Sequence, residues 1–181
     1  MFVDRDGVLN RAEVRDGKPY APRTVDDFRL LPGVSGAVQR LRDAGFLVIV
    51  VTNQPDIGNG LVDRHVVEAM HSTLCRLAQV DAIEMCPHRQ DEGCDCRKPK
   101  PGLLISAADR FAIDLRRSFV VGDRAQDIIA GRAAGCYTVF VDRGYREPPP
   151  AEPDAVVRSL PAAVRRIIAV TTKTTSGEAR R

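Results

Sequence analysis

Two aspartates, Asp4 and Asp6, follow an apolar stretch at the start of the chain and precede Gly7. Paired carboxylates at the end of a strand can divide the work of phosphoryl transfer. One attacks phosphorus, and the other donates a proton and later removes one. The glycine permits a tight turn, so that backbone N–H groups can face a phosphate. The pattern therefore indicates Asp4 as a nucleophile and Asp6 as a general acid and base.

Further polar groups are suited to neutralising a transferring phosphoryl group, which is the main requirement of this chemistry. Asp4 and Asp123 offer the hard oxygen ligands that select Mg²⁺, and Asp127 is placed to hold a metal-bound water or to orient Asp123. Thr52 offers a hydroxyl and a backbone N–H, and Lys98 balances the crowded carboxylates. Each feature alone is common on protein surfaces, but the four together favour catalysis.

Three thiols and one imidazole lie within a short stretch: Cys86, His88, Cys94 and Cys96. This set is typical of a closed, tetrahedral, structural Zn²⁺ site. Because Cys96 directly precedes Arg97 and Lys98, we expect the zinc to support catalysis by fixing this loop and not to catalyse. The alternative interpretation, buried or redox-active thiols, is preferred for Cys75 and Cys136, which lie inside apolar segments.

The surrounding apolar pattern alternates between short β-type runs and helical stretches. Apolar runs predict strands at residues 1–3, 46–51, 119–121 and 137–141. Helical spacing predicts helices at residues 34–44, 63–79, 103–111, 126–134 and 160–169. Strands that are apolar throughout and separated by helices are typical of a parallel sheet covered on both faces. We therefore expect an α/β fold with a mainly parallel sheet.

Polar residues follow three of the predicted strands, namely Asp4, Thr52 and Asp123. Ligands of such sheets bind outside the carboxyl ends of the strands, so these three side chains should converge on one site. We expect a single domain over residues 1–170, with a proline-rich connector at 147–153 and a disordered polar tail at 171–181.

The composition limits the partners. The chain has 181 residues, 44% hydrophobic and 28% charged, with a net charge of +3, which is too small a bias to favour nucleic acid. It has no Trp and few Phe and Tyr to stack on bases. No run is long enough for a transmembrane helix, and the first residues do not form a signal peptide. We expect a cytoplasmic monomer that binds a small phosphorylated metabolite, with no membrane partner.

Four short motifs resemble those of the haloacid dehalogenase superfamily of phosphatases. They are Asp4–Arg5–Asp6–Gly7, Thr52–Asn53–Gln54, Arg97–Lys98–Pro99 and Gly122–Asp123 with Asp127. More narrowly, the chain is similar, from residue 1 to about residue 143, to the branch of heptose bisphosphate and histidinol-phosphate phosphatases.

The resemblance implies a Rossmann-like three-layer sandwich in which Asp4 is the nucleophile and Asp6 the proton donor. It implies Mg²⁺ held by Asp4, the backbone carbonyl of Asp6, and Asp123. Thr52 and Lys98 would stabilise the phosphoryl group. Four residues are expected to contact substrate: Asn53, Gln54, Arg97 and Arg124.

Members of the family often carry an inserted cap domain, but core elements fill the intervals between these motifs. We therefore expect no cap and an open site, with residues 11–23 choosing the substrate. A sugar phosphate, heptose 1,7-bisphosphate, is the first candidate because residues 97–102 and 131–135 look like the heptose group. Histidinol phosphate is the second, because the zinc loop is short and Asp56 and Asn59 replace a glycine and an arginine of the heptose pattern. A zinc-stabilised binding module without catalysis is the alternative of another class.

Overall fold

Six short strands form the central sheet. Along the chain they are β1 (Phe2–Val3), β4 (Ile49–Asn53), β5 (Ala82–Cys86), β6 (Phe119–Gly122), β7 (Tyr137–Val141) and β8 (Ala155–Val157). Their order across the sheet is β5-β4-β1-β6-β7-β8, and every neighbouring pair is parallel. This computed structural model describes residues 1–178, with side chains through Thr172. The predicted α/β fold with a mainly parallel sheet is confirmed.

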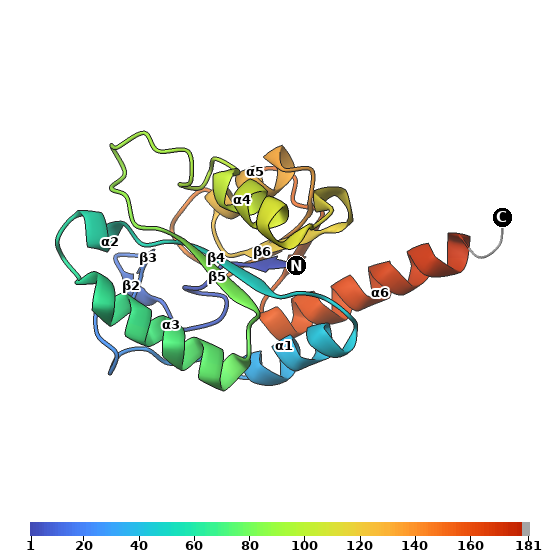
Figure 1. Cartoon of the computed structure of the whole chain (residues 1–181), viewed down its shortest axis with the longest axis horizontal. Helices are drawn as coiled ribbons and strands as arrows, with labels where there is room; N and C mark the ends of the chain where they lie inside the picture. The colour runs from blue at the N-terminus through green and yellow to red at the C-terminus, as the bar shows by residue number, and fades with distance from the viewer. Residues whose placement is uncertain (179–181) are drawn as a thin grey trace.

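Helices cover both faces of the sheet (Figure 1). One face is covered by α1 (Val34–Asp43), α3 (Arg64–Ala78) and α6 (Leu160–Glu178). The other face is covered by α4 (Gly102–Phe111) and α5 (Ala125–Ala133). The remaining elements are the short helices α2 (Pro55–Gly58) and η1 (Leu115–Arg117) and an antiparallel hairpin of β2 (Glu13–Arg15) and β3 (Lys18–Tyr20).

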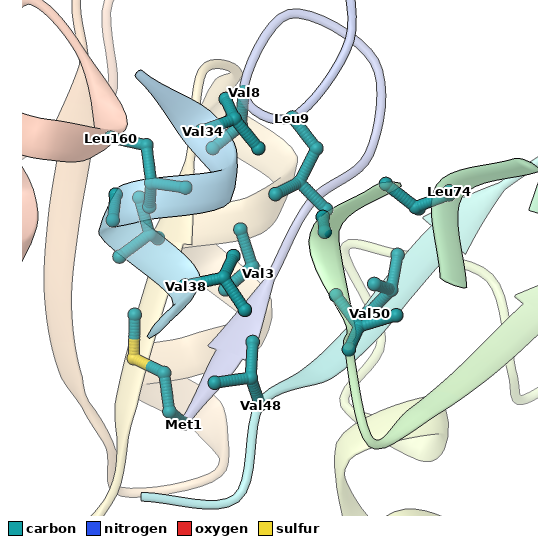
Figure 2. Close-up of a cluster of buried hydrophobic side chains, with 14 of the residues drawn as sticks. Met1, Val3, Val8, Leu9, Val34, Val38, Val48, Val50, Leu74 and Leu160 are labelled. Carbon is teal, nitrogen blue, oxygen red and sulfur yellow. The ribbon is translucent and has the colours of Figure 1, made fainter. Parts of the chain in front are cut away.

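Successive residues of a strand belong to two separate hydrophobic clusters, one on each face of the sheet, because side chains alternate between the two sides of a strand. Val3 and Val50 face the α1, α3 and α6 side, together with Val38 of α1 and Leu74 of α3 (Figure 2). Their neighbours Phe2, Ile49 and Val51 face α4 on the other side. Burial on both faces explains why the central strands read as continuous apolar runs.

The structure differs from the sequence prediction in three respects: the start of one strand, two strands that were not predicted, and the end of the chain. β4 starts at Ile49 and not at residue 46, because the turn that ends α1 continues through Phe46, whose N–H donates to the Leu41 carbonyl at 3.0 Å. β5 was not predicted because Glu84 interrupts its apolar run. β8 was not predicted because it has only three residues and follows the proline-rich connector.

The third difference concerns the end of the chain, where residues 171–178 were expected to be disordered. α6 instead continues to Glu178 and projects beyond the body of the protein (Figure 1). The hydroxyls of Thr171 and Thr172 donate to the Ile167 and Ile168 carbonyls, at 3.0 and 2.9 Å, which is compatible with a helix. Residues 179–181 lie outside the described part of the chain.

The fold leaves the carboxyl edge of the sheet without a separate covering domain. Within residues 1–178, the segments between the sheet strands hold only the core helices, α2, η1, the β2–β3 hairpin and loops. The hairpin lies in the segment 11–23 that was expected to choose the substrate. None of the helices in this described range is both long and apolar enough to cross a membrane.

Candidate active site

Two acids meet at the carboxyl edge of the central strands. Asp4 follows β1, and its N–H donates to the Val121 carbonyl of β6 at 2.9 Å. Asp123 follows β6, which pairs directly with β1. Thr52 is the penultimate residue of the neighbouring strand β4 and does not follow the strand as predicted. Asp4 and Asp123 are nevertheless brought together, as the parallel sheet required.

Lys98 lies at the centre of these carboxylates, in the loop between β5 and α4. Its Nζ contacts Asp4 Oδ1 at 2.6 Å and Asp127 Oδ1 at 2.5 Å, and it donates to the Val51 carbonyl at 2.8 Å. The side chain is only 2% exposed. Although burial opposes the ammonium form, the Asp127 and Asp4 carboxylates raise the pKa of Lys98 above its usual range. Lys98 therefore remains charged within the site.

Asp127 lies between Lys98 and the start of α5. Its Oδ1 pairs with Lys98, and its Oδ2 accepts the Arg124 N–H at 3.0 Å, which caps the start of α5. Oδ1 has this ion-pair contact but no hydrogen-bond partner in the described structure, and it lies close enough to Asp4 and Asp123 to share a metal ion. That Asp127 holds a metal-bound water or orients Asp123 stays a prediction, and its contact with Lys98 could not be seen from the local spacing.

The three buried acids could hold a metal ion. The candidate ligand atoms of Asp4, Asp123 and Asp127 all lie within 4.8 Å of one another. Asp123 Oδ1 is buried and has no hydrogen-bond partner among the described residues. Burial, followed by the charges of Asp4 and Asp127, raises the pKa of Asp123 well above its usual value, and burial also raises the pKa of Asp4. A cation would compensate these charges, so the residues fit a metal.

Asp6 is held by three buried side chains. Arg5 donates to both Asp6 oxygens through Nε and Nη2, at 3.0 to 3.3 Å. Asn10 Nδ2 donates to Oδ1 at 2.9 Å, and Gln54 Nε2 donates to Oδ2 at 2.7 Å. Arg5 is fully buried, with its guanidinium 5.9 Å from the Phe28 ring centroid. Arg5 and Asn10 were not among the expected site residues, although Arg5 lies within the first motif and Asn10 shortly after it.

Asn53 and Gln54 act within the protein. The Asn53 side chain donates to the Lys98 carbonyl at 3.0 Å and accepts the Lys98 N–H at 3.1 Å. The Gln54 amide also donates to Thr52 Oγ1 at 2.8 Å. These hydrogen bonds position Lys98, Thr52 and Asp6, and the expected contact of both side chains with substrate stays a prediction. Asn53 and Gln54 still line the cleft.

A cleft of about 280 Å³ opens above Asp4 and Asp6. Three cationic side chains line it, from Lys18 of the hairpin, Arg97 and Arg124. Arg97 Nη1 is buried without a hydrogen-bond partner in the described structure. Arg124 forms a two-point ion pair with Glu147, at 2.8 Å from Nε and 2.5 Å from Nη2. The expected substrate-contacting arginines therefore do reach the cleft.

The Cys and His residues of the β5–α4 loop lie close together and could hold a second metal ion. Cys86 Sγ lies 3.6 Å from Cys94 Sγ and 3.5 Å from His88 Nδ1. Cys96 Sγ lies 3.6 Å from Cys94 Sγ and 3.1 Å from His88 Nδ1. Cys75 and Cys136 lie outside this cluster, the first exposed and the second buried.

Comparison with known proteins identifies the family. Residues 95–163 match the family model described as HAD-hydrolase-like. The chain is 41% identical over 149 residues to D-glycero-beta-D-manno-heptose-1,7-bisphosphate 7-phosphatase of Pseudomonas aeruginosa, covering 80% of this chain and 81% of that protein. It is 36% identical over 188 residues to the Escherichia coli K12 enzyme of the same name, covering 92% and 93%.

A solved structure is similar over nearly the whole chain. It is D,D-heptose 1,7-bisphosphate phosphatase from B. bronchiseptica complexed with magnesium and phosphate, with a TM-score of 0.80 and 33% identity, covering 93% of this chain and 97% of that one. With this fold and this sequence identity to its relatives, the chain belongs to the haloacid dehalogenase superfamily of phosphatases, in the branch of the heptose 1,7-bisphosphate 7-phosphatases.

Proposed function

We propose that the protein is a Mg²⁺-dependent D-glycero-D-manno-heptose 1,7-bisphosphate 7-phosphatase that forms an aspartyl-phosphate on Asp4. The names of its relatives support this substrate. The observation that carries the chemistry is the position of Asp4, which is buried at the end of β1 against Lys98 and within ligand distance of Asp123. All of these groups come from one chain, so we propose that a monomer suffices for activity.

The reaction then proceeds in two displacements. A carboxylate oxygen of Asp4 forms a bond to phosphorus as the bond to the sugar oxygen breaks, and Asp6 gives its proton to that oxygen. Water next attacks phosphorus and Asp6 removes its proton, while the bond between Asp4 and phosphorus breaks and phosphate is released. Arg5, Asn10 and Gln54 hold Asp6 in place for both proton transfers.

Charge compensation comes from Lys98, from Thr52 and from the metal. Lys98 offsets the negative charge around Asp4, and Gln54 connects the Thr52 hydroxyl to Asp6. Mg²⁺ would be held by Asp4, Asp123 and the Asp6 backbone carbonyl, and it supplies neutralisation of the phosphoryl oxygens. The unpartnered Asp123 Oδ1 suits this ligand role.

We further propose that the Cys and His cluster binds structural Zn²⁺. Tetrahedral Zn–S bonds of about 2.3 Å place two thiolates about 3.8 Å apart, close to the 3.6 Å between the sulfurs here. The cluster ends at Cys96, two residues before Lys98. Binding zinc would therefore fix the main chain that delivers Arg97 and Lys98 to the cleft.

The lining of the cleft supports a substrate with a second phosphate. Lys18, Arg97 and Arg124 offer positive charge around the space next to Asp4. Histidinol phosphate is the second candidate, because Asp56 and Glu147 line the same cleft and could bind its cationic amine. A second phosphate would thus bind the cationic side chains of the cleft, whereas an amine would bind its carboxylates.

The test is release of inorganic phosphate by purified protein with Mg²⁺ and either heptose 1,7-bisphosphate or histidinol phosphate. We expect a higher kcat/KM for the bisphosphate. Asp4→Asn should lower kcat by about three orders of magnitude or more, because it removes the nucleophile. Asp26→Asn, at an exposed acid on another part of the surface, is the matched control and should retain activity.

The alternatives give different results. A preference for histidinol phosphate would reject the heptose substrate and keep the mechanism. Release of phosphate from neither, with p-nitrophenyl phosphate also left intact, would favour a binding module. Acid-quenched protein should carry one phosphoryl group in the wild type and none in Asp4→Asn. Its absence during steady turnover of the wild type would argue against the covalent intermediate.

A further inference from the structure

The loop that leaves β7 contacts the site at three places, although no sequence motif marks it. Arg143 Nε donates to the Gly7 carbonyl at 2.7 Å, in the turn that follows Asp6. The Tyr145 hydroxyl donates to Asp123 Oδ2 at 2.8 Å. Glu147 accepts both contacts from Arg124. We call residues 143–147 the clamp segment, because every second residue in it forms a hydrogen bond to residue 7 of the first motif or to residues 123 and 124 of the last.

The clamp segment is itself anchored from the opposite side. The Arg146 N–H donates to the Gly17 carbonyl at 2.8 Å, in the turn of the β2–β3 hairpin. A Cβ placed on Gly17 would lie 2.5 Å from Arg146 Cγ, so the hairpin turn and the clamp segment are in direct contact. The segment therefore connects the hairpin, the nucleophile turn and the start of α5.

Tyr145 has the contact that bears on chemistry. Its hydroxyl occupies one oxygen of Asp123, whereas the other, Oδ1, is buried without a protein partner among residues 1–178. A Cβ on Gly7 would lie 1.8 Å from Asp123 Oδ2 and 2.7 Å from Tyr145 Oη. The Gly7 backbone thus closes the remaining space beside this hydrogen bond. The carboxylate is held with Oδ2 against the tyrosine and with Oδ1 free of protein partners in the described structure, available to a cation.

We propose that Tyr145 is a positioning residue that sets the affinity of the site for Mg²⁺ by fixing the orientation of Asp123. Groups that hydrogen-bond to a metal ligand restrict its rotation before the metal arrives, and losing one typically weakens metal affinity by about 10- to 100-fold. The inference rests on the proposed Mg²⁺ site. The other two contacts of the clamp segment keep the tyrosine at its place.

Tyr145→Phe removes the hydroxyl and keeps the ring, so it is the variant to test. Mg²⁺ binding to the phosphate-free protein is measured by isothermal titration calorimetry, and the Mg²⁺ dependence of phosphate release is measured separately. We expect the Mg²⁺ dissociation constant and the activation constant both to rise by about tenfold or more. kcat at saturating Mg²⁺ and the melting temperature without Mg²⁺ should stay near the wild-type values.

Tyr137→Phe is the matched control. The Tyr137 hydroxyl also donates a hydrogen bond, to the Asp154 carbonyl at a distance of 3.3 Å, but this bond does not lie at the cleft. It should bind Mg²⁺ as the wild type does. Arg143→Gln keeps the tyrosine but removes the bond to Gly7, and should weaken Mg²⁺ binding by a smaller factor. This second variant tests the inference should Tyr145→Phe fail to fold.

Two results would overturn the inference. One is Mg²⁺ binding that is unchanged, within twofold, in folded Tyr145→Phe, or in Arg143→Gln should Tyr145→Phe fail to fold. The other is a lower melting temperature and a higher KM for substrate with an unchanged Mg²⁺ constant, which would mean a structural role only. A wild type that binds no Mg²⁺ would instead reject the proposed metal, so the two failures are distinguishable.

Discussion

Replacing Lys98 with methionine should destabilise the protein strongly. The ammonium is 2% exposed and lies 2.6 Å from Asp4 and 2.5 Å from Asp127, both of which are buried. Methionine fills nearly the same volume, so the cost arises from two carboxylates that lose their counter-charge. Breaking a buried ion pair from one side typically costs about 3–5 kcal/mol, a large part of the roughly 5–15 kcal/mol that stabilises a domain.

A double-mutant cycle separates the charge effect from lost packing. Asp127→Asn leaves Lys98 paired with Asp4, so we expect a cost of about 1–3 kcal/mol. In the double variant Lys98→Met with Asp127→Asn, one uncompensated carboxylate has gone. The summed single costs should therefore exceed the measured double cost, by about 1–3 kcal/mol.

Urea unfolding followed by far-UV circular dichroism in Mg²⁺-free buffer is the assay, since the chain has no Trp. Lys100→Met is the matched control, because Lys100 is 49% exposed and pairs with the exposed Asp95. A surface pair of this kind is worth about 0–1 kcal/mol. The reasoning fails if Lys98→Met costs no more than Lys100→Met, or if the cycle shows no coupling.

Three further predictions follow from the site. Cys94→Ser should reduce bound zinc and lower kcat more than it raises KM, because the loop before Lys98 loosens; metal analysis and steady-state kinetics check this, and full activity without zinc would contradict it. Glu147→Gln frees Arg124 from a partly exposed pair worth about 0.2–1 kcal/mol, so at saturating Mg²⁺ the KM for the bisphosphate should fall by up to about fivefold with kcat unchanged; a higher KM would reverse the interpretation. Burial and then Arg5 lower the pKa of His71 from 6.5 to about 4, so the unfolded chain binds a proton that the folded one does not. Stability should fall by up to about 3 kcal/mol from pH 6.5 to 4, and His71→Gln, unlike the exposed His65→Gln, should reduce that fall in urea titrations.

The parts of the fold that the sequence could predict are those with a local signal. The runs that end at Val3 and Val121 are buried on both faces, so their composition alone marks them as strands. The acids behind them then had to meet, because parallel strands end at one edge. β5 lies at the edge of the sheet and includes the partly buried Glu84, so its sequence has no such continuous apolar run.

The side chains that position the site could be predicted less well. The second motif identifies Asn53 as a candidate site residue, but not its hydrogen bonds to the Lys98 backbone, 45 residues away. Arg5 stands within the first motif, but only the fold shows that it is fully buried against Asp6. Residue type and spacing identify the groups that could act in catalysis or bind a metal. The contacts that position these groups depend on which loops the sheet brings together.

The balance of charge in the site links the stability of Lys98 variants to the metal. Asp4, Asp123 and Asp127 carry three negative charges when ionised, and Lys98 carries one positive charge, which leaves 3 − 1 = 2 negative charges to compensate. A divalent cation cancels this remainder, and burial, which raises the pKa of both Asp4 and Asp123, favours such compensation. Lys98→Met leaves three negative charges, so saturating Mg²⁺ should raise its melting temperature more than that of the wild type. An equal rise in both proteins would mean that the metal and Lys98 do not compensate the same carboxylates.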